Sequence, residues 1–384
     1  FKMSTGYPRG HQAGSVMAMA AFGDHEKYYD DFYKMSTSDF PYVKHTPPGY
    51  KRGVYVPPDE DVIHPYLDKY RKIAEKDEQE KMNMAAALQK VTEVHLFNII
   101  NQMIDWADKN NIQANNLCLA GGVSLNSVFT GKIKEKFKDR LTHVFVPPVP
   151  YDGGLSIGAC QYHYHHVLEN KRIENNFVSP YLGEEYSKEE VETAISSFSS
   201  NLTRKECSLE ECTNLLVDNK IISIFQGRSE SGRRALGNRS IVANPTSKDM
   251  KSLINEKVKH RQWYRPFAPT ILEEKGEEWF DNYFESPYMG FVFKVKKDKL
   301  GKAPAIEHKD GTARVQTVTK KQNKNYHNLI EKFYEKTGVP ILLNTSFNDR
   351  EPIVETPDHA IKCFLNTNID FLYFLEYGIL LSKK

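Results

Sequence analysis

Hydrophobic residues along this chain follow two different spacings, and each spacing predicts its own kind of element. Across residues 82–109 they recur every three to four positions, as at Leu88, Val91 and Leu96, which predicts a long amphipathic helix. Glu93 falls on or beside that stripe, either as a buried polar ligand or as a residue at its edge. Shorter helical patterns cover residues 15–23, 126–137, 246–257, 325–336 and 357–365.

Short apolar runs between the helical segments predict buried strands. They cover residues 143–148, 221–225, 240–244, 286–295 and 339–343, and a further run ends at Gly121. In residues 310–318 the period-two alternation of a strand puts Thr312, Arg314 and Gln316 on one face. Helices that alternate with buried strands in this way predict an α/β fold.

The length of the chain favours two domains. At 384 residues it is too long for one ordinary hydrophobic core. The polar segment at residues 168–184 predicts a boundary at about residue 170, which gives domains of residues 1–170 and 171–384. Two capping boxes, Ser187 with Glu190 and Ser208 with Glu211, predict helix starts just after it.

Composition narrows the class of protein. Hydrophobic residues make up 40% and charged residues 27%, as in soluble globular proteins, and no run is long enough to span a membrane. Five widely spaced cysteines without a C-x-x-C pair favour a reducing, cytoplasmic location over a disulfide framework or a zinc cluster. The chain begins at Phe1 rather than at methionine, as expected at a fragment boundary.

Positive charge is concentrated in residues 227–265. This stretch holds ten basic and three acidic residues, a net charge of +7, whereas the whole chain carries +2 and the remainder therefore −5. Arginines interleaved with Gly227, Gly232 and Gly237 suit a tight backbone around an oxyanion, because glycine permits close approach and guanidinium groups bind phosphate bidentately. The alternative is a solvated basic face, but apolar strands flank the stretch and favour a phosphate site.

Polar or glycine-rich turns follow three other predicted strands. Gly121 and Gly122 precede a helix that carries Asn126, which suits a nucleotide or a plain tight turn. Asp152 lies just past a strand end, either as a helix N-cap or as a metal or phosphate ligand. Residues 344–348 are rich in hydroxyl and amide groups, which suit either a small polar ligand or a capped turn.

Six motifs in a fixed order resemble the O-carbamoyltransferases of nodulation, antibiotic and toxin biosynthesis, from about residue 15 to the C-terminus. They are LAGGVSLN, the strand-end DGG, GRRALGNRS, NEKVKHR with YRPFAP, DGTARVQ and LLNTSFN. The resemblance implies that residues 1–170 are the C-terminal part of an actin-like (ASKHA) domain whose first half, with its paired metal-binding histidines, is not in this sequence. It implies that residues 171–384 resemble threonylcarbamoyl-adenylate synthase (YrdC-like).

The resemblance also implies two half-reactions. The C-terminal domain would form carbamoyl-adenylate from carbamoyl phosphate and ATP, and the actin-like domain would pass the carbamoyl group to a hydroxyl of a small molecule. The implied cofactors are ATP, Mg²⁺ and Fe(II) or a similar divalent metal, with carbamoyl phosphate as co-substrate. The expected partner is the small-molecule acceptor, with no membrane and no nucleic acid, and a homodimer is one expected assembly.

The matching motifs of the family imply which residues of this chain form the site. The implied catalytic residues are Lys259, Arg265, Arg314 and Ser346. Nucleotide or carbamoyl phosphate would bind at Arg234 and at the adenylate turn of Gly121, Gly122 and Asn126, and Arg239, Asn344 and Asn348 are added from their placement alone. Asp152 matches a carboxylate ligand of the metal. The family motif reads GPRALG, so Arg233 stands where the family has proline.

Two rival functions follow from the same residues. A threonylcarbamoyl-type tRNA-modifying enzyme would carry a basic surface beyond the arginine stretch, and the remaining charge of −5 speaks against it. A regulatory module that only holds nucleotide is the non-enzymatic alternative. Substitution of Lys259 or Arg314 separates these from the enzyme.

Overall fold

A computed structural model of the chain describes residues 13–36, 50–51, 54–55, 65–172 and 178–384. The chain divides into two compact units, residues 1–114 and 115–384. Within the described ranges no helix is both long enough and apolar enough to cross a bilayer.

The first unit is built on one 32-residue helix, α4 (Glu78–Lys109), which begins four residues before the predicted start. Asp77 fixes that start, because its side chain accepts a hydrogen bond from the Gln79 amide. Glu93 is only 4% exposed and accepts a hydrogen bond from Gln89, so it is a buried polar residue. The other elements of the unit are α1 (Ala13–Met19), η2 (Ala20–Phe22), α2 (Glu26–Met35), β1 (Tyr50–Lys51), β2 (Val54–Tyr55) and α3 (Pro65–Lys76).

Aromatic side chains make the core of this unit. Phe32 on α2 and Tyr70 on α3 are almost completely buried, and their rings meet edge to face with centroids 5.3 Å apart. Both pack with Val91 of α4 in one hydrophobic cluster. The predicted apolar stripe binds α2 and α3 only in its first part, at Leu88 and Val91. Farther along α4 the stripe residues Ile99, Met103 and Trp106 are exposed, so there the prediction of a buried face is wrong.

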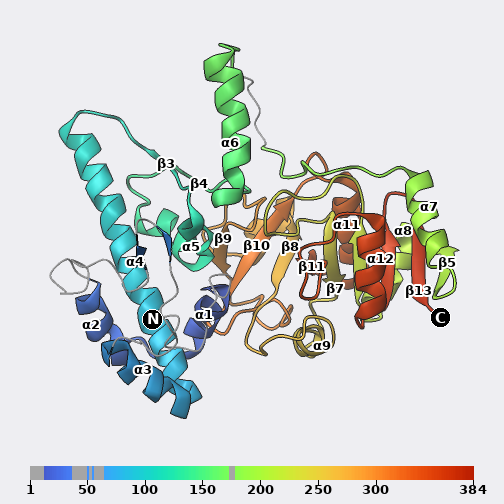
Figure 1. The fold of residues 1–384 in the computed structure, drawn as a ribbon, viewed down its shortest axis with the longest axis horizontal. Helices are drawn as coiled ribbons and strands as arrows, with labels where there is room; N and C mark the ends of the chain where they lie inside the picture. The colour runs from blue at the N-terminus through green and yellow to red at the C-terminus, as the bar shows by residue number, and fades with distance from the viewer. Residues whose placement is uncertain (1–12, 37–49, 52–53, 56–64, 173–177) are drawn as a thin grey trace. The chain divides into compact units, whose positions relative to one another are not determined.

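The second unit contains a mixed nine-stranded sheet (Figure 1). Its strand order is β5-β13-β12-β6-β7-β11-β8-β10-β9, with β12 parallel to β6, β10 parallel to β8, and antiparallel pairs elsewhere. The strands are β5 (Leu202–Glu206), β6 (Ile222–Phe225), β7 (Arg239–Ala243), β8 (Ala268–Leu272), β9 (Phe291–Lys294), β10 (Thr312–Val318), β11 (Ile341–Ser346), β12 (Phe371–Phe374) and β13 (Ile379–Lys383). All nine come from residues 202–383, inside the predicted C-terminal domain.

Helices cover this sheet in two contacting pairs. Helix α8 (Leu209–Val217) packs on α11 (Lys324–Thr337), and α7 (Lys188–Ser197) packs on α12 (Pro357–Asn366). The capping boxes predicted at Ser187 and Ser208 are both present and begin α7 and α8. Smaller helices are α9 (Met250–Lys257), α10 (Gly276–Trp279) and η6 (Glu273–Lys275).

Residues 115–167 contribute a smaller part of the second unit. Here β3 (Asn116–Cys118) pairs in parallel with β4 (His143–Phe145), and the helices are η3 (Gly122–Leu125), α5 (Ser127–Lys136), η4 (Asp152–Gly154), α6 (Leu155–Tyr162) and η5 (His163–Val167). Thr130 on α5 donates a 2.6 Å hydrogen bond to the Gly290 carbonyl beside β9, and Val146 belongs to the main hydrophobic cluster. The boundary predicted at residue 170 stays a prediction about family domains.

Two predicted elements are shorter than expected, for local reasons. Helix α9 begins at Met250 rather than at Thr246, because the Asn244 side chain accepts hydrogen bonds from the Thr246 amide and hydroxyl and holds a turn there. Strand β9 begins at Phe291 rather than at residue 286, because Met289 has a φ of 54°, outside the extended region.

Candidate functional site

Residues 226–238 connect β6 to β7 and carry Arg228, Arg233 and Arg234; we call them the arginine loop. Gly237 has a φ of 112°, and a side chain there would collide with the ring of Tyr326 on α11. The glycine predicted to permit close backbone approach therefore lets the loop lie directly on α11.

A buried carboxylate organises the arginine loop from inside. Glu230 is 8% exposed, and its Oε1 accepts hydrogen bonds from the amides of Leu236 (2.7 Å), Asn238 (2.8 Å) and Arg239 (3.4 Å). Its Oε2 has no partner among the residues that the structure describes. Burial raises the pKa of Glu230, whereas these amides and Arg239 oppose the rise.

The segment before α7 packs across this loop. Ser231 donates to the Pro180 carbonyl (2.6 Å), and Gly183 donates to the Ser229 carbonyl (3.1 Å). The hydroxyl of Tyr181 donates to the Leu236 carbonyl (3.0 Å). Residues 180–183, predicted only as a polar boundary, thus brace the arginine loop.

Arg239 anchors the base of the loop. Its side chain is completely buried, and its guanidinium stacks 3.5 Å from the ring centroid of Phe225. It donates to the backbone carbonyls of Gln226 (2.6 Å), Gly227 (3.1 Å), Asn238 (3.1 Å) and Glu355 (3.3 Å). These bonds hold both ends of the loop together, so Arg239 has a structural role, and its predicted ligand contact stays a prediction.

A polar layer on the sheet holds the other side of the loop. Asn344 on β11 donates to the Ala235 carbonyl (3.1 Å), and Gln316 on β10 donates to the Leu236 carbonyl (2.8 Å). The two side chains also bond to each other (3.0 Å) and to the Thr270 hydroxyl (2.7 and 3.0 Å). Asn344 is 1% exposed, so the amide added from placement alone is covered by the loop that it supports.

Four arginines come together as a group, which we call the cation cluster: Arg234, Arg261, Arg265 and Arg314. Burial, together with the charges of Arg233 and Arg265, lowers the pKa of Arg234 to about 10, and burial with the charge of Arg265 lowers the pKa of Arg261 to about 9. The pKa of Arg314 falls well below its ordinary value through burial and through the charges of Arg234, Arg261 and Arg265. Cations that lower one another's pKa lie close together, so the structure gathers the predicted residues Arg234, Arg265 and Arg314.

Three arginines of this cluster lack acidic partners among the residues that the structure describes. In the described part of the chain, Arg234, Arg261 and Arg314 form no ion pair with an acidic side chain. Arg314 Nε is buried and has no hydrogen-bond partner there. Partly buried cations without counter-ions are costly, and a bound polyanion would offset that cost.

Lys259 meets the turn after β11, as predicted for a shared site. The Lys259 ammonium donates to the Ser346 carbonyl (2.5 Å) and hydroxyl (3.2 Å) and to the Asn348 carbonyl (2.6 Å) and amide oxygen (2.7 Å). Burial, and then the charges of Arg261 and Arg265, lower the pKa of Lys259 to about 7. Lys259, Ser346 and Asn348 therefore form one constellation, electrostatically coupled to the cation cluster.

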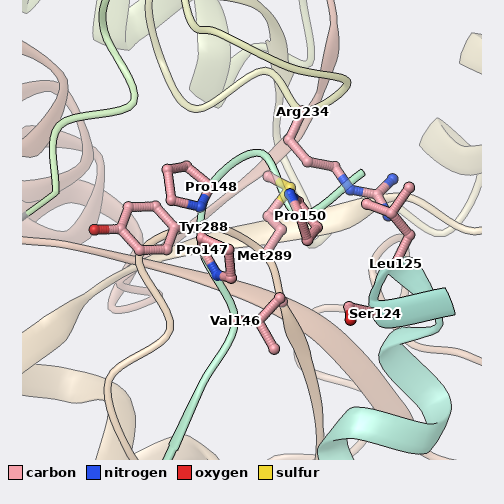
Figure 2. A pocket seen from close by; sticks show the side chains of 10 residues that line it. Ser124, Leu125, Val146, Pro147, Pro148, Pro150, Arg234, Tyr288 and Met289 are labelled. Carbon is pink, nitrogen blue, oxygen red and sulfur yellow. The ribbon is translucent and has the colours of Figure 1, made fainter. Parts of the chain in front are cut away.

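The predicted adenylate turn also approaches the arginine loop. Ser124 and Leu125 of η3 line a small pocket with Arg234, and the Arg234 side chain extends toward Leu125 (Figure 2). The pocket holds about 10 Å³, room for about one water molecule. Arg233 stacks 4.6 Å from the ring centroid of Tyr151, so the arginine at the family's proline position has a local partner.

Asn126 and the glycine pair adopt ordinary capping geometry. The Asn126 side chain accepts a hydrogen bond from the Phe129 amide (3.2 Å) and caps α5 instead of lying inside the helix. Gly121 has a φ of 90° and donates to the Pro150 carbonyl (2.6 Å). Both readings of this turn, nucleotide binding and a tight connection, remain open.

Asp152 lies at the start of η4 with an exposed side chain. No set of three histidine, cysteine, aspartate or glutamate side chains with the arrangement of a metal site occurs in the described ranges. The residues that the structure describes thus do not complete a metal site around Asp152, and no reaction step is assigned to a metal. The iron-type metal and Mg²⁺ stay predictions.

Three residues near the site were not singled out from the sequence. Arg261 lies in the motif NEKVKHR but was not chosen as a site residue, and it also donates to Asn255 (2.7 Å). Lys251 on α9 is half-buried, and burial and Arg261 lower its pKa. His308 has a pKa lowered by burial and by Arg314 and Lys251, which places it beside the cluster. The motif and the local charge density marked Arg261, and the local charge density alone marked Lys251.

Comparisons with known proteins agree with the motifs. The family model described as carbamoyltransferase N-terminus matches residues 1–161, and that described as carbamoyltransferase C-terminus matches residues 213–380. Nodulation protein NolO of Bradyrhizobium diazoefficiens is 34% identical over 370 residues, covering 93% of this chain and 63% of the relative. An uncharacterized protein of Synechocystis, sll1178, is 36% identical over 324 residues, covering 77% and 51%.

Nodulation protein NolNO of Sinorhizobium fredii is 34% identical over 381 residues, covering 95% of this chain and 52% of the relative. The chain spans about half the length of most of the curated relatives it matches. A crystal structure of HypF from T. kodakarensis aligns with 42% of this chain and 21% of that chain at 14% identity, with a TM-score of 0.28, too low to establish a common fold.

Proposed function

The chain belongs to the carbamoyltransferase family, and from this membership we propose that it forms carbamoyl-adenylate from carbamoyl phosphate and ATP and passes the carbamoyl group to a hydroxyl of a small molecule. The acceptor class is a sugar, a nucleoside or a natural product. The proposal includes an actin-like part in residues 1–170 and a YrdC-like domain in residues 171–384. All five cysteines are free, which supports a reducing compartment such as the cytoplasm.

The observation that supports this function is the absence of acidic partners for Arg234, Arg261 and Arg314 among the residues that the structure describes. Carbamoyl phosphate and ATP repel each other, and Arg234, Arg261 and Arg314 supply fixed positive charge where the two anions would meet. Guanidinium groups also bind phosphate oxygens bidentately and so fix their orientation. For phosphoryl and adenylyl chemistry, positioning and charge stabilisation supply most of the rate.

The first half-reaction balances with one water molecule. The carbamoyl group leaves its phosphate as carbamate, a carbamate oxygen attacks the α-phosphorus of ATP, and pyrophosphate leaves. Carbamoyl-adenylate, pyrophosphate and inorganic phosphate are the products. Lys259 and the Ser346 hydroxyl would bind phosphate oxygens, because the Lys259 ammonium already lies among polar groups of that turn.

Release of pyrophosphate from ATP, with and without carbamoyl phosphate, tests the proposal. We expect release that depends on carbamoyl phosphate in the natural chain and a fall of about 100-fold in Lys259→Met, the effect typical of removing one charge-stabilising group. Lys257→Met is the matched control, because Lys257 is the last residue of α9, two positions before Lys259, and its side chain is exposed. Release that survives in both Lys259→Met and Arg314→Met would show that the site is elsewhere.

A further inference from the structure

His308 lies in the connection between β9 and β10, directly before the strand that carries Arg314. Its amide donates to the Thr312 carbonyl (2.8 Å), and its carbonyl accepts from the Gly311 amide (3.0 Å). These bonds close a tight turn over the DGT segment and hold the imidazole at the start of β10. Thr312 and Arg314 are two residues apart on this strand, so their side chains share a face.

The hydrogen bonds of the turn fix the tautomer of this histidine. The Thr312 hydroxyl donates its only proton to Asp310 Oδ1 (2.8 Å), because a carboxylate can only accept. His308 Nδ1 lies 3.0 Å from the same hydroxyl oxygen and must therefore be the donor in that contact. In a neutral ring Nε2 then carries the lone pair, and Nε2 is buried without a partner among the described residues.

The surroundings keep this imidazole neutral. Burial lowers the pKa of His308 to about 4, and the charges of Arg314 and Lys251 act in the same direction against the opposing effect of Asp310. At neutral pH, Nε2 is therefore an acceptor beside two cations.

The guanidinium groups of the cation cluster offer no hydrogen-bond acceptor to a ligand. Guanidinium and ammonium groups only donate, so they bind phosphate oxygens and cannot recognise an amino group. Asn344 Oδ1 also has no partner in the described part of the chain, but Asn344 is 1% exposed beneath the arginine loop. His308 Nε2 is buried too, but His308 as a whole is half-buried, whereas Asn344 is covered by the arginine loop that it supports.

We propose that His308 Nε2 accepts a hydrogen bond from the amino group of carbamoyl phosphate and so distinguishes it from acyl phosphates of the same shape. The inference rests on the proposed function, because it takes carbamoyl phosphate as the ligand. Acetyl phosphate has a methyl group in place of the amino group, and with that ligand Nε2 would be buried without a donor. Such an unpaired group is how a polar site rejects an analogue.

Two substitutions of His308 distinguish loss of the acceptor at Nε2 from disruption of the turn. In His308→Asn, the amide nitrogen lies near the position of Nδ1 and can still donate to Thr312, whereas the acceptor at Nε2 is lost. In His308→Gln, the longer side chain brings an amide oxygen near the position of Nε2. The ratio of the dissociation constants for carbamoyl phosphate and acetyl phosphate, measured by calorimetry on the whole chain, is the readout.

We expect the natural chain to prefer carbamoyl phosphate, His308→Asn to lose about tenfold of that preference, and His308→Gln to retain it within about threefold. An equal loss of affinity for both ligands in His308→Asn, or an unchanged ratio, would overturn the inference, and so would a natural chain without preference. If the preference is present but ATP releases no pyrophosphate, the proposed function fails while this inference stands.

Discussion

Arg239 and Arg314 lie in the same unit and serve different ends. Arg239 is completely buried, donates to four backbone carbonyls and stacks on Phe225. Arg314 is half-buried, lies among other arginines, and its Nε has no partner in the described part of the chain. Arg239 Nη2 also has no partner there, so the difference lies in the four backbone carbonyls that Arg239 binds and in the arginines that surround Arg314.

This difference teaches how to separate structural from functional cations. Burial alone does not do so, because it lowers the pKa of both guanidinium groups. The distinguishing observations are the hydrogen-bond partners and the sign of the neighbouring charges: Glu230 and Glu355 lie near Arg239, whereas Arg234, Arg261 and Arg265 surround Arg314. Stability should depend on the first group and activity on the second.

The largest expected effect is the loss of the anchor. Arg239→Met leaves four backbone carbonyls without their donor and Glu230 without its nearby positive charge, so the free energy of unfolding should fall by about 4 kcal/mol. Urea denaturation followed by circular dichroism measures it. Arg204→Met is the control, since Arg204 pairs with Glu192 and Glu206 near the surface and should cost less than about 1 kcal/mol. Equal losses in both variants would contradict the comparison.

Removal of an arginine from the cation cluster should lower activity without lowering stability. Arg314→Met should lower carbamoyl-phosphate-dependent pyrophosphate release about 100-fold, which corresponds to about 2.7 kcal/mol of transition-state stabilisation. The thermal unfolding midpoint should stay the same or rise, because a repelling charge is removed. An Arg314→Met protein that unfolds at a much lower temperature would place Arg314 with Arg239 among the structural residues.

Removal of the Glu230 carboxylate inside the arginine loop should have a smaller effect on stability. Glu230→Ala leaves the buried amides of Leu236 and Asn238 without an acceptor, and we expect a loss of about 2 kcal/mol in the free energy of unfolding. Glu230→Gln keeps an oxygen acceptor for these amides and should cost under about 1 kcal/mol. If the Gln variant loses as much as the Ala variant, the negative charge, rather than the acceptor, organises the loop.

The smallest expected effect is the uptake of protons when a polyphosphate binds near Lys259. In the ligand-free chain the pKa of Lys259 is about 7, so at pH 8 its amine is mostly neutral. A bound polyphosphate raises that pKa, and the complex should take up a fraction of a proton at pH 8. Calorimetric titration with pyrophosphate in two buffers of different ionisation enthalpy measures the uptake, which should vanish in Lys259→Met. Proton release on binding would contradict the expected rise in the pKa of Lys259.

The same depressed pKa fixes how stability changes with pH. Between about pH 7 and the ordinary value of 10.5, the unfolded chain keeps a proton on Lys259 that the folded chain has released. The contribution of Lys259 to stability therefore rises with pH across that window. Below about pH 7 both states hold the proton, and the folded state bears the cost of a buried cation.

Much of the fold could be predicted from local patterns. The period of the apolar residues located α4, the capping boxes located α7 and α8, and the helical pattern at residues 325–336 located α11. Element starts were predicted less well wherever a side chain holds a turn, as Asn244 does before α9. Such bonds depend on neighbours that a hydrophobic pattern does not report.

The site was predictable where charge density or motifs marked it. Lys259 and Ser346 are far apart in sequence, yet the motifs placed them together, and their side chains are hydrogen-bonded. Glu230 and His308 were not singled out, because their roles depend on which backbone amides or hydroxyls fold around them. Asn344 was singled out as a possible ligand-binding residue after an apolar strand. It lies on β11 and supports the arginine loop from beneath.

Glu230 has a consequence for how fast a ligand can be bound. Its carboxylate occupies the amides inside the loop as an internal substitute for an anion, so the loop reaches its curved shape before any phosphate arrives. A preorganised cradle loses little conformational entropy when it is filled. Association should then be limited by diffusion and electrostatic steering, and the salt concentration would change the on-rate far more than the off-rate.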